Sequence, residues 1–321
     1  MYVIASYHYP LETIEYAGRT CYMSQDKITA GSAAKFVSKI KNVGHLSVLE
    51  HSRLIICEPD DMDKARSILY VVALEHPEIE MSTYLNGAVF SGNYRAWLDL
   101  LSALRKHCHN SGWWSGIGNC NIELVDELYE LLVKHNPAVF ADDTLLLSNT
   151  ESIIQDISSK YHDIEISILD YCIPNYSIAE QHGAMTVRIK GGSRCLTHEL
   201  VRHRKASFSQ QSQRYVDESG FPYVIPEEII HAGANALTEY TSSIKHSSEV
   251  YSKLQASYDL KKQIARYVLP NATVSEIVMT ATWKWWKHFF SLRCSSKAQP
   301  EMQTIAYMIR DLSKTIYLGS F

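Results

Sequence analysis

Residues 202 to 215 form a run of hydrogen-bond donors that contains no carboxylate, RHRKASFSQQSQRY. The run holds three arginines, one lysine, one histidine, three serines and three glutamines. Guanidinium and hydroxyl groups suit phosphate oxygens, and glutamine amides can both donate to and accept from the edge of a planar heterocycle. The run therefore predicts a site for a nucleotide or a dinucleotide.

The first residues of this run also have a purely structural interpretation. RCLTHELVRHR has a helical pattern that Ser193 can cap, and cations near a helix C-terminus complement the helix dipole. The donors nevertheless continue from Ser207 to Arg214, beyond the expected end of the helix. A bound polyanion explains this continuation, whereas the helix dipole does not.

Strands and helices flank the run without a regular alternation. The alternating pattern of MTVRIKGG predicts a strand before the helix, and VSEIVMTAT predicts another strand ahead of the helix KWWKHFFSLR. Residues 236 to 268 predict one long helix or two shorter ones that end before Pro270. This mixture favours the α+β class.

Residues 54 to 184 differ from the segments around them. Helical patterns occur in RAWLDLLSALRKH and IELVDELYELLVKH, and turn-rich pieces join them. The alternation of Ile164, Ile166 and Ile168 predicts a strand near the end of the block. We interpret the block as mainly helical.

The composition is that of a globular protein and excludes several classes. The 321 residues are 46% hydrophobic and 21% charged, with a formal net charge of -4. An acidic chain argues against a nucleic-acid-binding surface, and no stretch approaches the roughly 20 apolar residues that span a bilayer. The start MYVIASYHYP lacks the pattern of a signal peptide, so we expect a cytoplasmic protein with no nucleic-acid or membrane partner.

The seven cysteines are odd in number and form no CxxC pair, which predicts reduced thiols. The string HCH at residues 107 to 109, with Cys120 downstream, could be imagined as a metal site. Adjacent residues rarely point at one ion, so we predict no metal. Cys195 lies near an expected helix start, but Ser193 is the better cap, and a nucleophilic Ser212 would need a partnered base that is not evident.

Six motifs together resemble the flavin-dependent thymidylate synthases, the ThyX family. RHRKASFSQQSQRY resembles the family signature, and five others occur in the family's order: AGRTCY, VGHLSVLEH, GGSRCLTHELVRHR, QIARYVLPNAT and HFFSLR. The resemblance covers roughly residues 11 to 53 and 185 to 310. It implies a core of residues 1–53 and 185–321, with mixed helices and an antiparallel-type sheet, which a mostly helical insertion at residues 54–184 interrupts.

The resemblance also implies a homotetramer that binds FAD in active sites shared between subunits. Members of the family transfer the methylene group of methylenetetrahydrofolate to dUMP, and NADPH supplies the electrons through the flavin. Carried over by position, the expected FAD contacts are His45, Ser47, Arg202, His203, Arg204, Gln210, Thr282, Lys284 and His288. The expected dUMP contacts are Glu199, Arg202, Gln210, Gln211, Ser212, Gln213, Arg214, Arg266 and Arg293.

Arg293 is the expected catalytic residue. It matches the arginine thought to help ionise the uracil N3 in the family, and a guanidinium there would make C5 electron-rich enough to attack the methylene carbon. Arg266 would be borrowed from a neighbouring chain if the family's tetramer holds. Without the flanking match, Arg266 would be interpreted as a solvated residue on an amphipathic helix.

Thr282 departs from the family pattern, because many members carry an asparagine at its place. SGNYRAW at residues 91 to 97 resembles the segment expected there. One hypothesis is that Asn93 and Arg95 approach the flavin or cover its pocket. The alternative is an ordinary helix start.

Two other functions are compatible with the sequence. A relative of these enzymes could alkylate a different pyrimidine nucleotide or release a hydroxymethyl product. A non-catalytic protein could keep the pocket as a sensor or an RNA-binding module, although the acidic net charge and the retained Arg293 speak against it.

Overall fold

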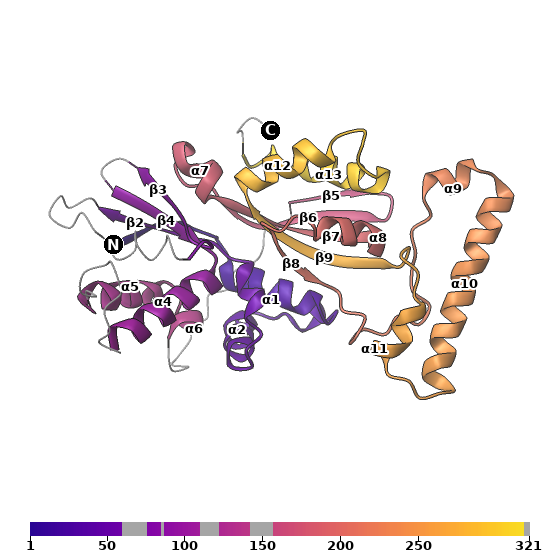
Figure 1. Ribbon diagram of the computed structural model, residues 1–321, viewed down its shortest axis with the longest axis horizontal. Coiled ribbons are helices and arrows are strands. Elements are labelled where there is room, and N and C mark those ends of the chain that lie inside the picture. The colour runs from indigo at the N-terminus through magenta and orange to yellow at the C-terminus, as the bar shows by residue number, and fades with distance from the viewer. Residues whose placement is uncertain (60–75, 85–86, 110–121, 142–156, 318–321) are drawn as a thin grey trace.

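The computed structural model of the chain describes residues 1–59, 76–84, 87–109, 122–141 and 157–317. These residues form two antiparallel sheets surrounded by helices, and one long helix, α10, stands apart from both sheets (Figure 1). The chain is therefore an α+β protein, as the sequence predicts. The first half of the chain denotes the described residues up to 141, and the second half denotes residues 157–317.

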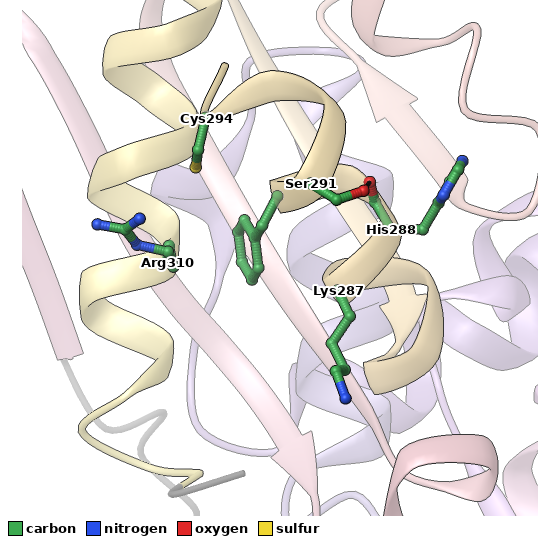
Figure 2. Close-up of a pocket in the computed structure, with 6 residues that line it drawn as sticks. Lys287, His288, Ser291, Cys294 and Arg310 are labelled. Atoms are coloured by element: carbon green, nitrogen blue, oxygen red, sulfur yellow. Dashed lines mark hydrogen bonds between the residues drawn. The ribbon is translucent and has the colours of Figure 1, made fainter. Parts of the chain in front are cut away.

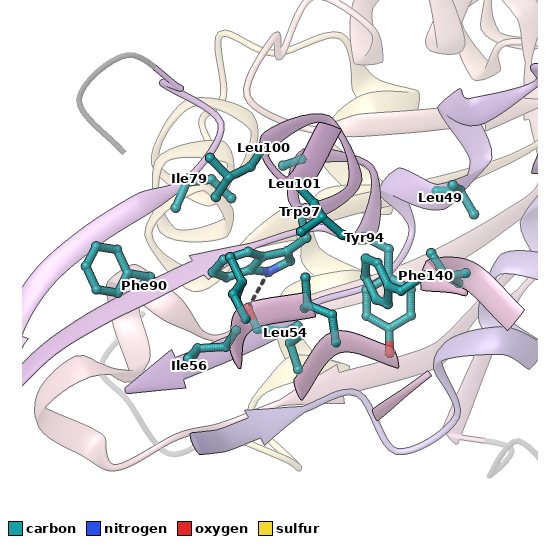
Figure 3. Close-up of a cluster of buried hydrophobic side chains, with 14 of the residues drawn as sticks. Leu49, Leu54, Ile56, Ile79, Phe90, Tyr94, Trp97, Leu100, Leu101 and Phe140 are labelled. Carbon is teal, nitrogen blue, oxygen red and sulfur yellow. Dashed lines mark hydrogen bonds between the residues drawn. The ribbon is translucent and has the colours of Figure 1, made fainter. Parts of the chain in front are cut away.

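The sheet of the first half has the strand order β1-β2-β4-β3. Its strands are β1 (Tyr2–Ser6), β2 (Leu54–Pro59), β3 (Glu80–Tyr84) and β4 (Gly87–Gly92). The helices of this half are α1 (Pro10–Thr20), α2 (Ser32–Asn42), α4 (Tyr94–His109), α5 (Ile122–His135) and α6 (Pro137–Phe140), with the 3-10 turns η1 (Gln25–Lys27) and η2 (Leu46–Glu50). The apolar face of α4 packs on the sheet, where Tyr94 and Trp97 join Leu54 and Phe90 in a buried cluster (Figure 3).

The sheet of the second half has the strand order β5-β6-β7-β9-β8. Its strands are β5 (Ile157–Tyr161), β6 (Ile164–Cys172), β7 (Ala184–Ser193), β8 (Ser207–Gln210) and β9 (Val274–Thr282). The helices are α7 (Tyr176–His182), α8 (Arg194–Leu200), α12 (Trp283–Arg293) and α13 (Pro300–Ser313). Ser193 caps α8, because its Oγ accepts a hydrogen bond from the Leu196 backbone N–H at 3.0 Å. This confirms the predicted cap. Strands β7 and β9 confirm the two strands predicted from MTVRIKGG and VSEIVMTAT.

An arm projects from the second half between β8 and β9. It consists of α9 (Glu227–His231), α10 (Ala234–Ala256), α11 (Lys262–Ala265) and a 3-10 turn (Arg266–Val268). The arm leaves large apolar side chains in solvent: Ile230, Tyr258 and Ile264 are at least half exposed, and Tyr267 is 82% exposed. The described residues of the chain do not cover this apolar surface.

The two sheets repeat one arrangement. The order and antiparallel pairing of β1-β2-β4-β3 recur in β6-β7-β9-β8. The pairing of β1 with β2 is irregular between Val3 and Ala5, and the pairing of β6 with β7 is irregular between Ile168 and Asp170. The two sheets therefore share an irregularity at the corresponding place in their first strand pair. Such bulges are specific features of a strand and not defects.

Helix α4 follows β4 and helix α12 follows β9, and both helices are anchored to their sheet in the same way. On α4, the indole N–H of Trp97 donates to the Leu54 carbonyl at 3.2 Å. On α12, the indole N–H of Trp286 donates to the Met185 carbonyl at 3.1 Å. Both tryptophans are fully buried, so each bond satisfies a polar group inside a core.

Residues 54 to 184 contain more strands than the sequence predicts. The described part of this block holds strands β2 to β6 as well as helices α4 to α7. Because β2 pairs with β1 and β6 pairs with β7, each end of the block lies inside a sheet. The assignment of the block to an insertion stays a prediction.

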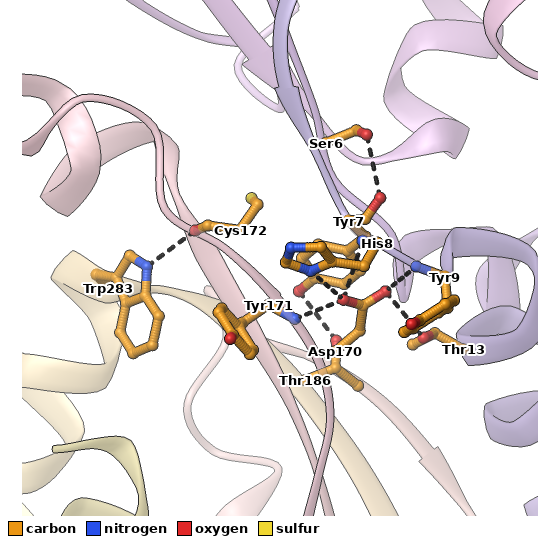
Figure 4. Close-up of polar contacts among 10 residues, drawn as sticks. All are labelled: Ser6, Tyr7, His8, Tyr9, Thr13, Asp170, Tyr171, Cys172, Thr186 and Trp283. Atoms are coloured by element: carbon orange, nitrogen blue, oxygen red, sulfur yellow. Dashed lines mark hydrogen bonds and ion pairs between the residues drawn. The ribbon is translucent and has the colours of Figure 1, made fainter. Parts of the chain in front are cut away.

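A buried aspartate joins the two halves where α1 begins. Asp170 of β6 accepts hydrogen bonds from the backbone N–H groups of His8 at 3.1 Å and Tyr9 at 2.8 Å, and from the Thr13 hydroxyl at 3.3 Å (Figure 4). A negative charge is favourable at a helix N-terminus. Asp170 thereby fixes α1, which also contacts β8 and β9 of the second sheet.

Candidate functional site

The first part of the donor run lines a pocket of about 350 Å³ beyond the end of α8. The walls come from the turn that follows α8, from β9 and from α12. The lining residues are Arg202, His203, Arg204, Lys205, Ala206, Met279, Ala281, Trp285, His288, Leu292 and Arg293. Predicted site residues from two separate parts of the sequence therefore meet in one cationic pocket.

Arg293, the last residue of α12, has a fixed direction in this pocket. Its Nη1 donates to Glu199 Oε2 at 3.0 Å, and its Nε donates to His203 Nε2 at 3.0 Å. Burial, reinforced by the charges of Arg293 and His288, lowers the pKa of His203 to about 4. His203 is therefore neutral at pH 7, accepts at Nε2 and carries its proton on Nδ1. Among the described residues, Arg293 Nη2 has no hydrogen-bond partner and is free to bind a ligand.

The later part of the run continues along a neighbouring surface. Gln210 Nε2 donates to Thr197 Oγ1 at 2.8 Å, and Gln211 Nε2 donates to Glu218 Oε1 at 3.0 Å. The Ser212 backbone N–H donates to the Cys21 carbonyl at 3.0 Å. These bonds hold the loop that carries Ser212, the buried Gln213 and the exposed Arg214.

Five cations of this region have no carboxylate within salt-bridge distance in the part of the chain that the structure describes. They are Arg202, Arg204, Lys205, Arg214 and Arg266. Several arginines elsewhere are paired with glutamates, for example Arg19 with Glu15 and Arg188 with Glu276. Like charges held together repel each other, so a bound anion would stabilise this region. The arrangement suits phosphate groups.

Arg194, the first residue of α8, belongs to this surface and was not singled out from the sequence. Its Nη1 donates to the Gln211 carbonyl at 3.5 Å. Its pKa is lowered by burial and by the charge of Arg266, although Glu218 opposes the shift. The signal in the sequence is the order Ser193-Arg194, because a cation directly after a helix cap meets the unfavourable positive end of the helix dipole.

The remaining predicted flavin contacts do not line the pocket. His45 and Ser47 lie in the first half at η2, a segment that contacts β8. Thr282 is the last residue of β9 and directly precedes α12, and its buried Oγ1 has no partner among the described residues. Lys284 is exposed, with its Nζ 6.0 Å from the ring centroid of Trp285. The structure thus brings together one part of the predicted set, and the flavin assignments stay predictions.

Asn93 and Arg95 lie at the start of α4 and next to η2. Asn93 Oδ1 accepts from the Ala96 backbone N–H at 2.8 Å, which is the bond of a helix cap. Arg95 Nη1 donates to Glu50 Oε1 at 2.6 Å, so it contacts the segment that carries Ser47. The predicted helix start is confirmed, and the approach of these residues to a flavin stays a hypothesis.

A second pocket, of about 450 Å³, shares His288 with the first (Figure 2). Its other lining residues are Lys287, Phe290, Ser291, Cys294 and Arg310. Lys287 pairs with Glu180 at 3.0 Å, and Arg310 pairs with Asp311 at 3.2 Å. Because its cations are already paired, this pocket is the weaker candidate for an anion.

Three of the described cysteines are poor nucleophiles. Burial raises the pKa of Cys21 and Cys294, and it raises the pKa of Cys172 to about 12. A raised pKa disfavours the reactive thiolate. The described residues contain no group of three or more histidine, cysteine or acidic side chains placed to hold a metal ion, and the side chains at 107–109 and Cys120 lie outside them. No helix among the described residues has the length and apolar character needed to cross a membrane.

The fold and the pocket define an α+β protein with a cationic site suited to phosphate. The chain belongs to the thymidylate synthase complementing protein family, whose model matches residues 139–317. This match covers more than half of the chain and confirms the resemblance that the motifs indicate.

Several curated relatives carry the name flavin-dependent thymidylate synthase. The chain is 39% identical over 143 residues to that of Nitratidesulfovibrio vulgaris, a match that covers 42% of this chain and 58% of the relative. It is 37% identical over 140 residues to that of Corynebacterium efficiens, covering 39% of this chain and 56% of the relative. The chain thus spans less than two thirds of the length of these relatives. A crystal structure of Thymidylate Synthase X (ThyX) from Helicobacter pylori with FAD and dUMP is 25% identical, with a TM-score of 0.35 over 42% of this chain and 70% of that chain.

Proposed function

We propose that the protein is a flavin-dependent thymidylate synthase, which methylates dUMP to dTMP with methylenetetrahydrofolate as the carbon donor and NADPH as the reductant. Its family and the names of its relatives support this proposal. The observation that carries it is Arg293, held by Glu199 and neutral His203 on the wall of a pocket rich in unpaired cations.

Arg293 is the catalytic residue in this proposal. Its guanidinium would stabilise the negative charge that develops on the uracil N3 and its neighbouring oxygens. This stabilisation would make C5 electron-rich enough to attack the methylene carbon. An arginine does not act as a base at neutral pH, so its role is electrostatic. Glu199 and His203 hold the guanidinium before the substrate arrives, and this pre-organisation lowers the cost of reaching the transition state.

The phosphate of dUMP is assigned to the loop surface. Arg214 and Arg266 are cations without a carboxylate partner among the described residues, and the Ser212 hydroxyl lies 3.3 Å from the Arg214 backbone nitrogen. Arg194 adds a further positive charge close to Arg266. Arginine forks match phosphate oxygens in geometry as well as in charge.

The donors of the pocket also fit the phosphates of FAD. Arg202, Arg204 and Lys205 offer unpaired positive charge. Outside the pocket lining, the buried Thr282 Oγ1 lacks a partner among the described residues. Bound FAD would supply the hydride that reduces the transferred carbon to a methyl group. His45 and Ser47 are proposed to hold the flavin from the η2 segment.

A homotetramer with shared active sites belongs to the same proposal. The exposed apolar side chains of the arm, Tyr258, Ile264 and Tyr267, support self-association, because an apolar patch of this kind marks an interaction surface. Arg266 lies in the same arm, so association would bring it to a shared site. The acidic net charge supports the absence of nucleic-acid partners. A cytoplasmic location is proposed because the scattered cysteines, with no CxxC pair, fit reduced thiols.

The mass of the product tests the proposal. Purified protein is incubated with FAD, NADPH, methylenetetrahydrofolate and dUMP, and dTMP is expected. A hydroxymethylated nucleotide would keep the site and change the reaction, and untouched dUMP in the presence of bound FAD would contradict the proposal. Arg310→Ala, which alters the second pocket, is the control and should leave turnover unchanged.

A further inference from the structure

A buried histidine from the first half holds two strands of the second sheet. His51, which follows η2, is completely buried. Its Nδ1 is 2.8 Å from Thr280 Oγ1 in β9, and its Nε2 is 2.9 Å from Ser209 Oγ in β8. One imidazole therefore connects two neighbouring strands that belong to the other half of the chain.

A second buried histidine makes the same contacts in the opposite direction. His182, at the end of α7 in the second half, is also completely buried. Its Nδ1 is 2.7 Å from Ser91 Oγ in β4, and its Nε2 is 2.6 Å from Ser82 Oγ in β3. Each half thus reaches into the sheet of the other half with one histidine.

The registers of the two sheets make these contacts equivalent. In each sheet the serine on the edge strand lies opposite a valine, which is Val89 in β4 and Val278 in β9. The second hydroxyl lies two residues after that valine, at Ser91 and Thr280. The two histidine clusters therefore occupy corresponding places in the repeated arrangement.

Both histidines are neutral at pH 7, since burial lowers the pKa of His51 to about 3 and the pKa of His182 to about 4. A neutral imidazole donates from one nitrogen and accepts at the other, and a hydroxyl can serve either. Both ring nitrogens of each histidine are thus satisfied. The cluster around His182 also contains a charged group, because Arg53 Nη2 donates to Ser91 Oγ at 2.7 Å.

The two clusters differ in the segment that follows the edge strand carrying the serine. Ser209 immediately precedes Gln210, where the loop to Arg214 begins, and β8 has only four residues. The first half holds this loop at a second point three residues later, because the Ser212 N–H donates to the Cys21 carbonyl. Ser82 lies in β3, which leads to no comparable set of donors among the described residues.

We propose that His51 is a positioning residue for the nucleotide site. It holds β8 at Ser209 and thereby fixes the direction in which the loop from Gln210 to Arg214 leaves the sheet. His182 makes equivalent bonds that serve stability alone. The identity of the ligand, dUMP, rests on the proposed function, whereas the fixing of the loop does not. A loop that is already ordered loses less conformational entropy when a ligand binds, so the loss of this support weakens binding.

Matched substitutions separate positioning from stability. Ser209→Ala and Ser82→Ala each remove one hydroxyl and leave the histidine in place, so both variants should fold with similar losses in unfolding temperature. Calorimetric titration with dUMP should show about tenfold weaker binding for Ser209→Ala, which is the loss of one good hydrogen bond. Ser82→Ala should bind within about twofold of the unaltered protein.

Two replacements of His51 give a sharper test. A glutamine places its amide nitrogen near the Nε2 position and can keep the bond to Ser209, whereas an asparagine reaches only the Nδ1 position and Thr280. His51→Gln should retain dUMP binding, and His51→Asn should lose it about tenfold. Equal dUMP affinities for the two variants would overturn the proposal, because a purely structural histidine gives no reason for Ser209 to matter more.

Amide hydrogen exchange tests the positioning even if dUMP does not bind. Peptides that contain Gln211 and Ser212 should exchange at least about tenfold faster in Ser209→Ala than in Ser82→Ala, since their N–H groups are bonded to the Glu276 and Cys21 carbonyls in the intact protein. Unchanged exchange in Ser209→Ala would overturn the proposal. Failure of the unaltered protein to bind dUMP would contradict the proposed function alone.

Discussion

Helices α4 and α12 follow equivalent strands in the two halves, yet they end in different surroundings. Counted from Tyr94 and Trp283, the eleventh residue is Leu104 in α4 and Arg293 in α12. Leu104 is 5% exposed and packs in the core of the first half. Arg293 lines the pocket. One scaffold thus supports a core contact in one half and a candidate catalytic group in the other.

The arginines of the two halves differ in the same way. In the first half Arg19, Arg53 and Arg95 each lie within salt-bridge distance of a glutamate. In the second half the arginines of the donor run have no such partner among the described residues. The charge of a paired arginine is balanced by its glutamate, whereas unpaired arginines gathered in a pocket are available to an anion. Charge pairing, rather than strand order, therefore separates the candidate site from its counterpart.

The largest effect is expected from alanine substitutions at Arg293 and Leu104. Arg293→Ala should reduce turnover at least about a hundredfold, because it removes the charge that stabilises the transition state. Leu104→Ala should instead cost about 2 to 5 kcal/mol of the free energy of unfolding, with turnover per folded molecule unchanged. Steady-state kinetics and thermal unfolding of both variants check this. Loss of turnover in folded Leu104→Ala would contradict the division of roles between the two helices.

The next largest effect is a dependence of stability on pH, to which one histidine from each half should contribute. His51 and His182 stay neutral when folded, with pKa values of about 3 and 4, whereas the unfolded chain takes up protons below the usual value of 6.5. The free energy of unfolding should therefore fall as the pH drops from about 6.5 toward 4, by up to about 1.4 kcal/mol per pH unit for each histidine. Denaturant unfolding at several pH values measures this slope. His51→Gln and His182→Gln should each flatten it, and an effect of only one of them would show that the clusters are not equivalent.

A smaller effect is expected from the glutamate partner of Arg293. Glu199→Gln keeps an oxygen that can accept from the Arg293 guanidinium, and it removes a negative charge beside the group that the proposal places at the uracil ring. Binding of dUMP should become about threefold tighter, in line with the modest energies of partly exposed ion pairs. Glu50→Gln, which alters the Arg95 pair of the first half, is the matched control and should leave dUMP affinity unchanged. Weaker binding in Glu199→Gln would mean that the carboxylate mainly orients Arg293.

The smallest effect is expected on stability, from substitutions at the N-terminal caps of α4 and α12. Asn93 caps α4 through its side chain, whereas Thr282 starts α12 without a side-chain capping bond. Asn93→Ala should destabilise the protein by about 1 kcal/mol, and Thr282→Asn should stabilise it by about 0.5 to 1 kcal/mol. Thermal unfolding measures both changes. Flavin titration of Asn93→Ala then decides the remaining hypothesis, because reduced FAD affinity would place Asn93 near the flavin.

Local patterns in the sequence predicted several elements correctly. The alternation around Val187 and Ile189 indicated β7, and Ser193 caps α8 as expected. The pattern over residues 236 to 268 predicted one long helix or two shorter ones, and the structure has the two helices α10 and α11 there. Signals of this sort depend on neighbours a few residues away, so the sequence displays them directly.

The long-range contacts could not be predicted in this way. The bonds of His51 join residues that are 158 and 229 positions apart in the chain. Arg194 was missed because its importance depends on the approach of Arg266 and Gln211. Nothing in the local pattern of either residue specifies such partners.

Residue types and local periodicity were sufficient to specify the α+β class, the family motifs and the set of donor side chains. The three-dimensional packing was needed to establish which donors are left unpaired and which half holds them in place. Burial of the two cores fixes the registers of the sheets, and those registers bring His51 to Ser209 and Arg293 to His203. Strand register depends on packing across the whole sheet, which no local pattern contains.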